Sequence, residues 1–163
     1  MTPAEQLFNQ IMQQHTPLIS KVCYMYATDT EHFKDLTQEV AANIWCGLDS
    51  FRAESKASTW IYRVAINTCV SFYRRNKRHE GALPLDSAGT VAIDNADAEH
   101  REQLAMMYRL ISDLGKIDRA LIMLWLDEKS YDEMAEITGL TRANVASRLH
   151  RARARLTLKA QQL

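Results

Sequence analysis

Cysteine is scarce in this chain of 163 residues, which contains three: Cys23, Cys46 and Cys69. An odd number argues against a disulfide framework, and no Cys-x-x-Cys or His-x-x-x-His spacing indicates a zinc site. Each cysteine lies in an apolar helical pattern. We therefore expect all three to be small, buried core residues.

Long apolar runs are also lacking. No segment approaches the ~20 consecutive apolar residues that span a bilayer. At the N-terminus, Met1–Glu5 contains no basic stretch followed by a hydrophobic block, so we expect no signal peptide. The expected protein is cytoplasmic and makes no membrane contact.

The residue patterns of catalysis are missing as well. The sequence has no Walker-type Gly-x-x-x-x-Gly-Lys-Ser/Thr motif, no persuasive carboxylate cluster and no nucleophile–base pair at a useful spacing. Its histidines are scattered, and each is expected at the surface or in packing: His15, His32, His79, His100 and His150. We expect neither an enzyme nor a bound metal, cofactor or small-molecule substrate.

Charge, by contrast, is gathered in blocks. The formal net charge is zero, and 47% hydrophobic with 25% charged residues is a globular composition. Residues 52–80 nevertheless carry seven basic and two acidic side chains, a net of +5. Residues 141–163 carry six basic and no acidic ones, a net of +6. Two compact basic blocks on an otherwise acidic chain indicate two contacts with a polyanion.

All strong periodicity in the sequence is helical, and no segment is typical of a strand. A capping box at Thr2–Glu5 starts a first helix, which Pro17 should kink or split. A second helix begins near Thr28 or Glu31.

The helical pattern breaks at residues 80–98, where glycine and proline lie among small and acidic residues without an apolar stripe. The predicted fold is all-α: two small helical domains joined by a flexible linker, the second a four-helix domain with a helix-turn-helix. The predicted boundaries are 1–80 for the first domain, 81–99 for the linker and 100–163 for the second domain.

The spacing of a helix-turn-helix appears near the C-terminus. Ser130–Glu133 is a capping box that starts a short helix. Gly139 falls where the chain must turn in the left-handed conformation. Thr141 then caps a second helix from about Arg142 to Lys159, which is predicted to lie in the major groove of DNA.

This recognition helix is two-faced. Its buried stripe is predicted to be Val145, Leu149, Ala152 and Leu156. The residues largely outside that stripe are Arg142, Asn144, Ser147, Arg148, Arg151 and Arg155. The N-terminal part of such a helix reaches base edges and its flanks hold phosphates. We assign base edges to Asn144 and Ser147, with Arg142 or Arg148, and phosphates to Arg151, Arg153 and Arg155. A merely solvated basic helix is the alternative, although no acidic residue follows Glu136.

A further helix, capped by Thr59, is predicted from Trp60 to about Lys77. One of its faces gathers aromatic, amide and basic residues: Trp60, Arg63, Asn67, Ser71, Arg74 and Arg78. Rings that stack on bases, an amide that reads an edge and arginines that hold phosphate suit single-stranded nucleic acid. Trp60 would replace a stacked base, with a core tryptophan as the alternative.

Two blocks of residues resemble a known family, and the resemblance covers nearly the whole chain outside the linker. The first comprises Asp35-Leu36-Thr37-Gln38-Glu39-Val40, then Leu48-Asp49-Ser50-Phe51-Arg52, then the run from Ser58 to Asn67. The second is Ser147-Arg148-Leu149-His150-Arg151-Ala152-Arg153 with the helix before it. In this order they resemble regions 2 and 4 of extracytoplasmic-function sigma factors.

The resemblance implies roles for particular residues. Asp35, Gln38 and Glu39 would bind the coiled-coil clamp helices of core RNA polymerase. The loop from Arg52 to Ala57 would enclose a base flipped from the −10 element. The implied −10 set is Phe51, Arg52, Ser55, Lys56, Trp60, Arg63, Asn67, Arg74, Arg75 and Arg78. The recognition helix would bind the −35 duplex, and the linker would thread toward the RNA exit path.

The expected partners are therefore core RNA polymerase, promoter DNA and an anti-sigma factor, which the family commonly has. The chain departs from the family pattern at Ala41 and Ala42, where bulkier residues are usual, and at Ala146, where a basic residue is frequent. The alternative is a conventional helix-turn-helix regulator with an unrelated sensor domain. It would leave the faces at Asp35–Glu39 and Trp60–Arg78 unexplained.

Overall fold

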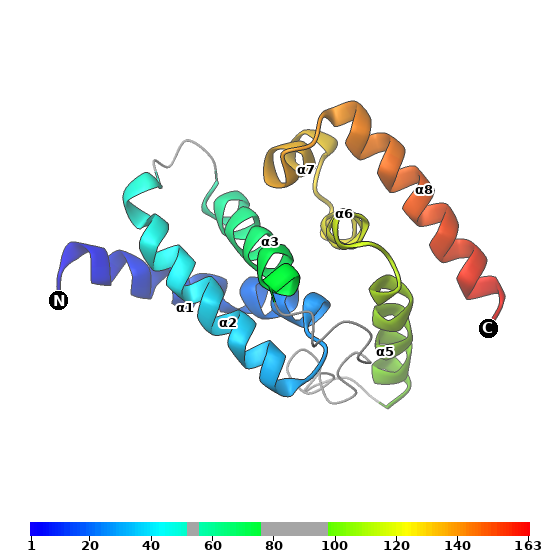
Figure 1. Ribbon diagram of the computed structural model, residues 1–163, viewed down its shortest axis with the longest axis horizontal. Coiled ribbons are helices and arrows are strands. Elements are labelled where there is room, and N and C mark those ends of the chain that lie inside the picture. The colour runs from blue at the N-terminus through cyan, green and yellow to red at the C-terminus, as the bar shows by residue number, and fades with distance from the viewer. Residues whose placement is uncertain (52–55, 76–97) are drawn as a thin grey trace. The chain divides into compact units, whose positions relative to one another are not determined.

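The computed structural model describes residues 1–51, 56–75 and 98–163, and every regular element within these ranges is a helix (Figure 1). The chain separates into two compact units, Met1–Ala92 and Ile93–Leu163. No helix in the described part of the chain is long and apolar enough to cross a membrane. Most of the predicted linker, together with Arg52, Ser55 and Arg78, lies outside the described residues.

The first unit begins with α1 (Pro3–Tyr26), whose start is the predicted capping box. The Thr2 hydroxyl accepts from the Glu5 backbone N–H at 3.2 Å, and the Glu5 carboxylate accepts from the Thr2 N–H at 2.7 Å. Pro17 lies inside this one helix, so the predicted split is wrong. Burial of apolar residues on both sides of the proline, Ile11 and Ile19 among them, favours one continuous helix over the break.

The second helix, α2 (Thr30–Gly47), is capped by Asp29, whose carboxylate accepts from the His32 N–H at 2.7 Å. Its core stripe is spaced four residues apart and fully buried: Leu36, Val40 and Ile44. This spacing places the predicted polar residues of α2 on other faces of the helix. A short 3-10 turn, η1 (Leu48–Ser50), follows directly.

The third helix, α3 (Ala57–Arg75), starts earlier than predicted. The N–H groups of Thr59 and Trp60 both donate to the Lys56 carbonyl, at 3.0 and 3.3 Å. Thr59 therefore belongs to the first turn and is buried, so its assignment as the cap is wrong. Deeper in the unit, Thr68 accepts from the Asn43 amide at 2.9 Å, which satisfies a buried hydroxyl between α2 and α3.

The cysteines divide in a way that the sequence did not indicate. Cys23 on α1 and Cys69 on α3 are buried free thiols, as predicted. Cys46 is exposed, so its prediction as a core residue is wrong. It lies two residues after Ile44 on α2, and that step turns it away from the buried stripe.

The second unit contains α5 (Ala98–Ser112), α6 (Lys116–Leu126), α7 (Tyr131–Thr138) and α8 (Arg142–Gln161). Five consecutive residues of α6 are buried, Ala120–Leu124, because the other helices of the unit surround it. Burial of consecutive residues is typical of a helix at the centre of a helical unit.

Candidate nucleic-acid interface

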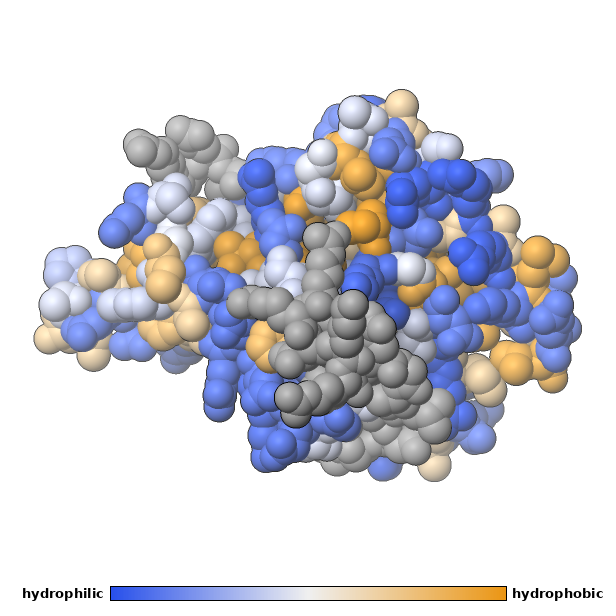
Figure 2. Space-filling model, in the orientation of Figure 1, coloured by the Kyte–Doolittle hydropathy of each residue, from blue (hydrophilic) through white to orange (hydrophobic). Residues whose placement is uncertain are grey.

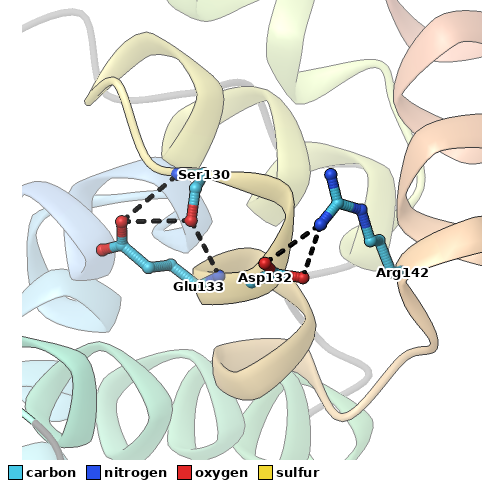
Figure 3. A network of polar contacts seen from close by, with 4 residues as sticks. All are labelled: Ser130, Asp132, Glu133 and Arg142. Atoms are coloured by element: carbon cyan, nitrogen blue, oxygen red, sulfur yellow. Dashed lines mark hydrogen bonds and ion pairs between the residues drawn. The ribbon is translucent and has the colours of Figure 1, made fainter.

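The helix-turn-helix has the predicted local geometry. The Ser130 hydroxyl accepts from the Glu133 N–H at 3.1 Å, and the Glu133 carboxylate accepts from the Ser130 N–H at 3.4 Å, so α7 begins at a capping box (Figure 3). Gly139 ends α7 with a φ of +78°, which glycine adopts without steric cost. Thr141 caps α8 by accepting from the Asn144 N–H at 3.1 Å.

The recognition helix α8 is buried along one stripe and exposed elsewhere. Val145, Leu149 and Ala152 are buried as predicted, whereas Leu156 is only half-buried. The exposed set contains five of the six predicted −35 residues: Arg142, Asn144, Ser147, Arg151 and Arg155. Hydrophilic residues extend along the visible face of α8 (Figure 2). This helix presents amide, hydroxyl and guanidinium groups opposite its packed stripe.

Arg148, the sixth predicted −35 residue, contacts the body of its own unit. Its Nε donates to Asp118 on α6 at 2.9 Å, and the two side chains are 34% and 22% exposed. Arg153 also contacts α6, with its guanidinium carbon 4.3 Å from the centroid of the Trp125 ring. Both arginines thus connect α8 to α6, one near each end of α6. Sequence reasoning missed these roles because the partners are distant in the chain.

The predicted −10 face on α3 is exposed along its middle. Arg63, Asn67 and Ser71 follow one another at the spacing of a helix face, and all three are exposed. Of the remaining predicted residues, Lys56 is exposed, and the backbones of Arg74 and Arg75 lie in the last turn of α3. Polar side chains that can contact bases therefore share one surface of α3.

Trp60 lies at the start of this surface and is half-buried. Its ring centroid is 4.9 Å from that of Phe51, with the planes tilted by 38°. A Cβ added to Gly47 would lie 3.1 Å from Cζ2 of Trp60, so the indole edge packs against the end of α2. The tryptophan is thus packed on one side and partly accessible, which combines features of both sequence-based alternatives.

The predicted polymerase-binding residues lie on α2. Asp35 and Gln38 are exposed, and Glu39 is half-buried. Trp45, two turns after Gln38, is 44% exposed and meets Phe8 edge-on at 5.4 Å. Sequence reasoning passed over this tryptophan because large aromatic residues are usually highly buried.

Within residues 1–51, 56–75 and 98–163, no group of three or more His, Cys, Asp or Glu side chains is placed to bind an ion. The two predicted faces instead carry amides, hydroxyls and guanidinium groups, with an aromatic pair beside one of them, and these are types of group found at nucleic-acid interfaces.

Comparison with known proteins identifies both units. Residues 11–79 match the model of sigma-70 region 2, and residues 104–156 match that of sigma-70 region 4. The chain is 29% identical to RNA polymerase sigma factor YlaC of Bacillus subtilis over 157 residues, covering 93% of this chain and 88% of that one. It is 26% identical to the ECF RNA polymerase sigma-E factor of Escherichia coli K12 over 171 residues, covering 98% and 89%.

A solved structure shares the fold. Sigma factor RpoE of Bartonella quintana, crystallised with the anti-sigma factor NepR, superposes with a TM-score of 0.73 at 24% identity. The alignment covers 94% of this chain and 96% of that one. The two sigma-70 regions cover most of the chain, in the order that the resemblance implied. The chain therefore belongs to the extracytoplasmic-function subfamily of RNA polymerase sigma factors, which are transcription initiation factors that bind core RNA polymerase and promoter DNA.

Proposed function

We propose that this sigma factor recognises its promoters with two separate helix faces. The recognition helix α8 reads the −35 element as duplex, and α3 with the loop before it captures an unpaired −10 base. The observation that carries the proposal is that each unit has one helix with an exposed polar face. Asn67 lies in the middle of the first face, and Asn144 with Ser147 lies at the N-terminal part of the second.

The free-energy cost of extruding a −10 base and the free energy gained by capturing it are of similar size. Extruding a base from the duplex costs a few kcal/mol, and stacking a base on an aromatic ring returns ~1–3 kcal/mol. The accessible part of Trp60, supported by Phe51 at 4.9 Å, supplies one such ring. Arg63 adds a phosphate contact on the same face. One captured base and a few phosphate contacts can therefore offset local unpairing without ATP.

We propose that α2 binds the clamp helices of the polymerase. In support, Asp35 and Gln38 are exposed on this helix, and Glu39 is half-buried beside them. We place region 2 in residues 1–80, a linker in 81–99 and region 4 in 100–163. The protein would act where the polymerase is, in the cytoplasm. The relative crystallised with NepR supports an anti-sigma factor as a further partner.

The central experiment mixes the purified protein with core RNA polymerase. We expect a stable complex by gel filtration and promoter-dependent transcription in vitro. A protein that forms no complex with the core enzyme, yet binds a specific duplex tightly by itself, would instead be a conventional helix-turn-helix regulator.

The −10 assignment is tested by Asn67→Ala. The exposed amide is assigned to a base edge in the melted strand, so this variant should impair open-complex formation, measured by permanganate reactivity of unpaired thymines. Binding to a −35 duplex should be intact, because Asn67 lies on α3. Asn144→Ala is the matched control and should show the opposite pattern. Equal loss of both activities in Asn67→Ala would overturn the assignment.

A further inference from the structure

The start of the recognition helix carries an ion pair between α7 and α8. One terminal nitrogen of Arg142, Nη1, donates to both carboxylate oxygens of Asp132, at 2.9 and 3.0 Å (Figure 3). Arg142 is the first residue of α8, and Asp132 lies in the first turn of α7. The pair therefore joins the two helices of the motif at the end of α8 where base contacts are made.

This ion pair is too exposed to be explained by stability. The side chains of Arg142 and Asp132 are 65% and 74% accessible, and ion pairs of that exposure contribute little to folding. The pair does restrict the guanidinium, because Nη1 is held by both oxygens of one carboxylate. The capping box formed by Ser130 and Glu133 fixes the turn of α7 that carries Asp132.

The ion pair leaves one edge of the Arg142 guanidinium without a hydrogen-bond partner among the described residues. Among the described residues, no hydrogen bond engages Nε or Nη2 of Arg142. These two nitrogens form the planar edge with which arginine donates to two acceptors at once. In the major groove, guanine presents such a pair of acceptors, O6 and N7. Ala143 and Ala146 lie nearby in the sequence. Their side chains are single methyl groups, which cannot compete with Arg142 for hydrogen bonds to the same base.

The other arginines of α8 are placed differently. Arg148 uses its Nε on Asp118, and Arg153 lies over Trp125. Arg151 and Arg155 are exposed in the later turns, where flanking phosphates are expected. Arg142 is thus the arginine at the N-terminal end of α8 with an unused donor edge and a fixed orientation.

We propose that Asp132 is a positioning residue, which presents the Nε–Nη2 edge of Arg142 to a guanine of the −35 duplex. The proposal rests on the proposed function of α8. It makes the preference for one −35 base depend on the ion pair between Asp132 of α7 and Arg142 of α8.

The test uses holoenzyme assembled from the full chain and core RNA polymerase. A library of randomised duplexes yields the preferred −35 sequence, and each guanine in it is then replaced singly by 7-deazaguanine, which lacks the N7 acceptor. The wild-type holoenzyme should lose affinity roughly tenfold at one guanine. Arg142→Ala and the isosteric Asp132→Asn should no longer distinguish that guanine from its deaza form. Arg151→Ala is the matched control and should still distinguish them.

Other outcomes overturn the proposal in separable ways. Full discrimination by Asp132→Asn would mean that Asp132 does not position Arg142. Tighter binding of Asp132→Asn to every duplex, with discrimination kept, would mean that its charge only repels DNA. A uniform loss in Arg142→Ala, with a weaker salt dependence, would make Arg142 a phosphate contact. Failure of the wild-type chain to join core polymerase would refute the proposed function itself.

Discussion

Glu128 is the one non-glycine residue with a positive φ among the described residues, at +60°. It follows the end of α6, where the Lys129 N–H donates to the Leu124 carbonyl at 3.1 Å and closes the helix. A side chain in the left-handed conformation costs roughly 1–2 kcal/mol, because Cβ approaches backbone oxygen. Glycine usually occupies such a position after a helix.

Replacing this residue by glycine should therefore stabilise the protein. For Glu128→Gly we expect a gain of about 0.5 kcal/mol in the free energy of unfolding, since relief of strain exceeds the added entropy of the unfolded chain. Urea denaturation measures it. Glu128→Ala keeps the Cβ and is the control. An equal gain in both variants would assign the effect to the lost charge.

The buried thiol of Cys69 should make the free energy of unfolding depend on pH. Burial raises the pKa of its thiol well above the ordinary value of 9.0, and the neighbouring Cys23 thiol raises it further. Above pH 9.0 the unfolded thiol ionises while the folded one keeps its proton. The free energy of unfolding should therefore fall as pH rises past that value. Cys69→Ala should show a smaller fall between neutral and alkaline pH; an unchanged fall would exclude Cys69 as its source.

At the residue scale, the sequence predicted exposure better than it predicted partners. Helical spacing placed Asn144 and Ser147 opposite the buried stripe, and both are exposed. No spacing rule indicated that Arg148 would meet Asp118, because 30 residues separate them and only the packing of α6 on α8 brings them together. Cys46 was misjudged because a two-residue step from Ile44 changes the helix face.

At the scale of elements, some arginines of α8 contact α6 and others are exposed. Arg151 is exposed, and no partner of its side chain is found among the described residues. We expect Arg151→Ala to weaken binding to every duplex about equally and to lower the salt-dependence slope by about one, since one phosphate contact is lost. Anisotropy titrations across salt concentrations measure the slope.

The control for this variant removes the same charge from the other unit. Arg63→Ala on α3 should leave −35 duplex binding and its slope unchanged. A similar drop in both variants would attribute the effect to net charge. Loss of preference at a single base pair in Arg151→Ala would instead assign this residue to a base edge.

Element ends were the least predictable part of the fold. Capping boxes at Thr2 and Ser130 and the glycine turn at Gly139 were predictable because each depends on residues within one turn. The start of α3 was missed because Lys56 accepts two backbone hydrogen bonds, a role open to any residue type. Pro17 was given too much weight because burial elsewhere in α1 opposes its local effect.

At the scale of the whole molecule, each unit has its own buried core, so the two units should lose structure separately. Leu36 in the first unit and Leu149 in the second are both buried side chains. Truncating either one to alanine should cost about 2–5 kcal/mol. In hydrogen exchange, Leu36→Ala should deprotect α1–α3 alone, and Leu149→Ala should deprotect α5–α8 alone. Deprotection of both units by one variant would show that they unfold together.

The all-α class followed from helical periodicity, which is a local property repeated along the chain. The order of the two sigma-70 regions followed from the resemblance of two blocks of residues to a known family. What each arginine of α8 contacts did not follow, because it depends on how α6 and α7 pack. The sequence therefore predicted which polar side chains of α8 are exposed, and the structure was needed to show which of its arginines contact other side chains of the same unit.

The buried residues of α8 all lie between Val145 and Ala152, although the helix continues to Gln161. Beyond Ala152 the helix has no fully buried side chain, and Leu158 is 60% exposed. Amides in the last turns should accordingly exchange by local fraying, at rates that global stability does not set. Beyond Ala152 the helix is held to its unit by partly exposed contacts, such as that of Lys159 with Asp113 at 3.4 Å, so we expect its far end to adjust its direction when it meets a curved surface such as DNA.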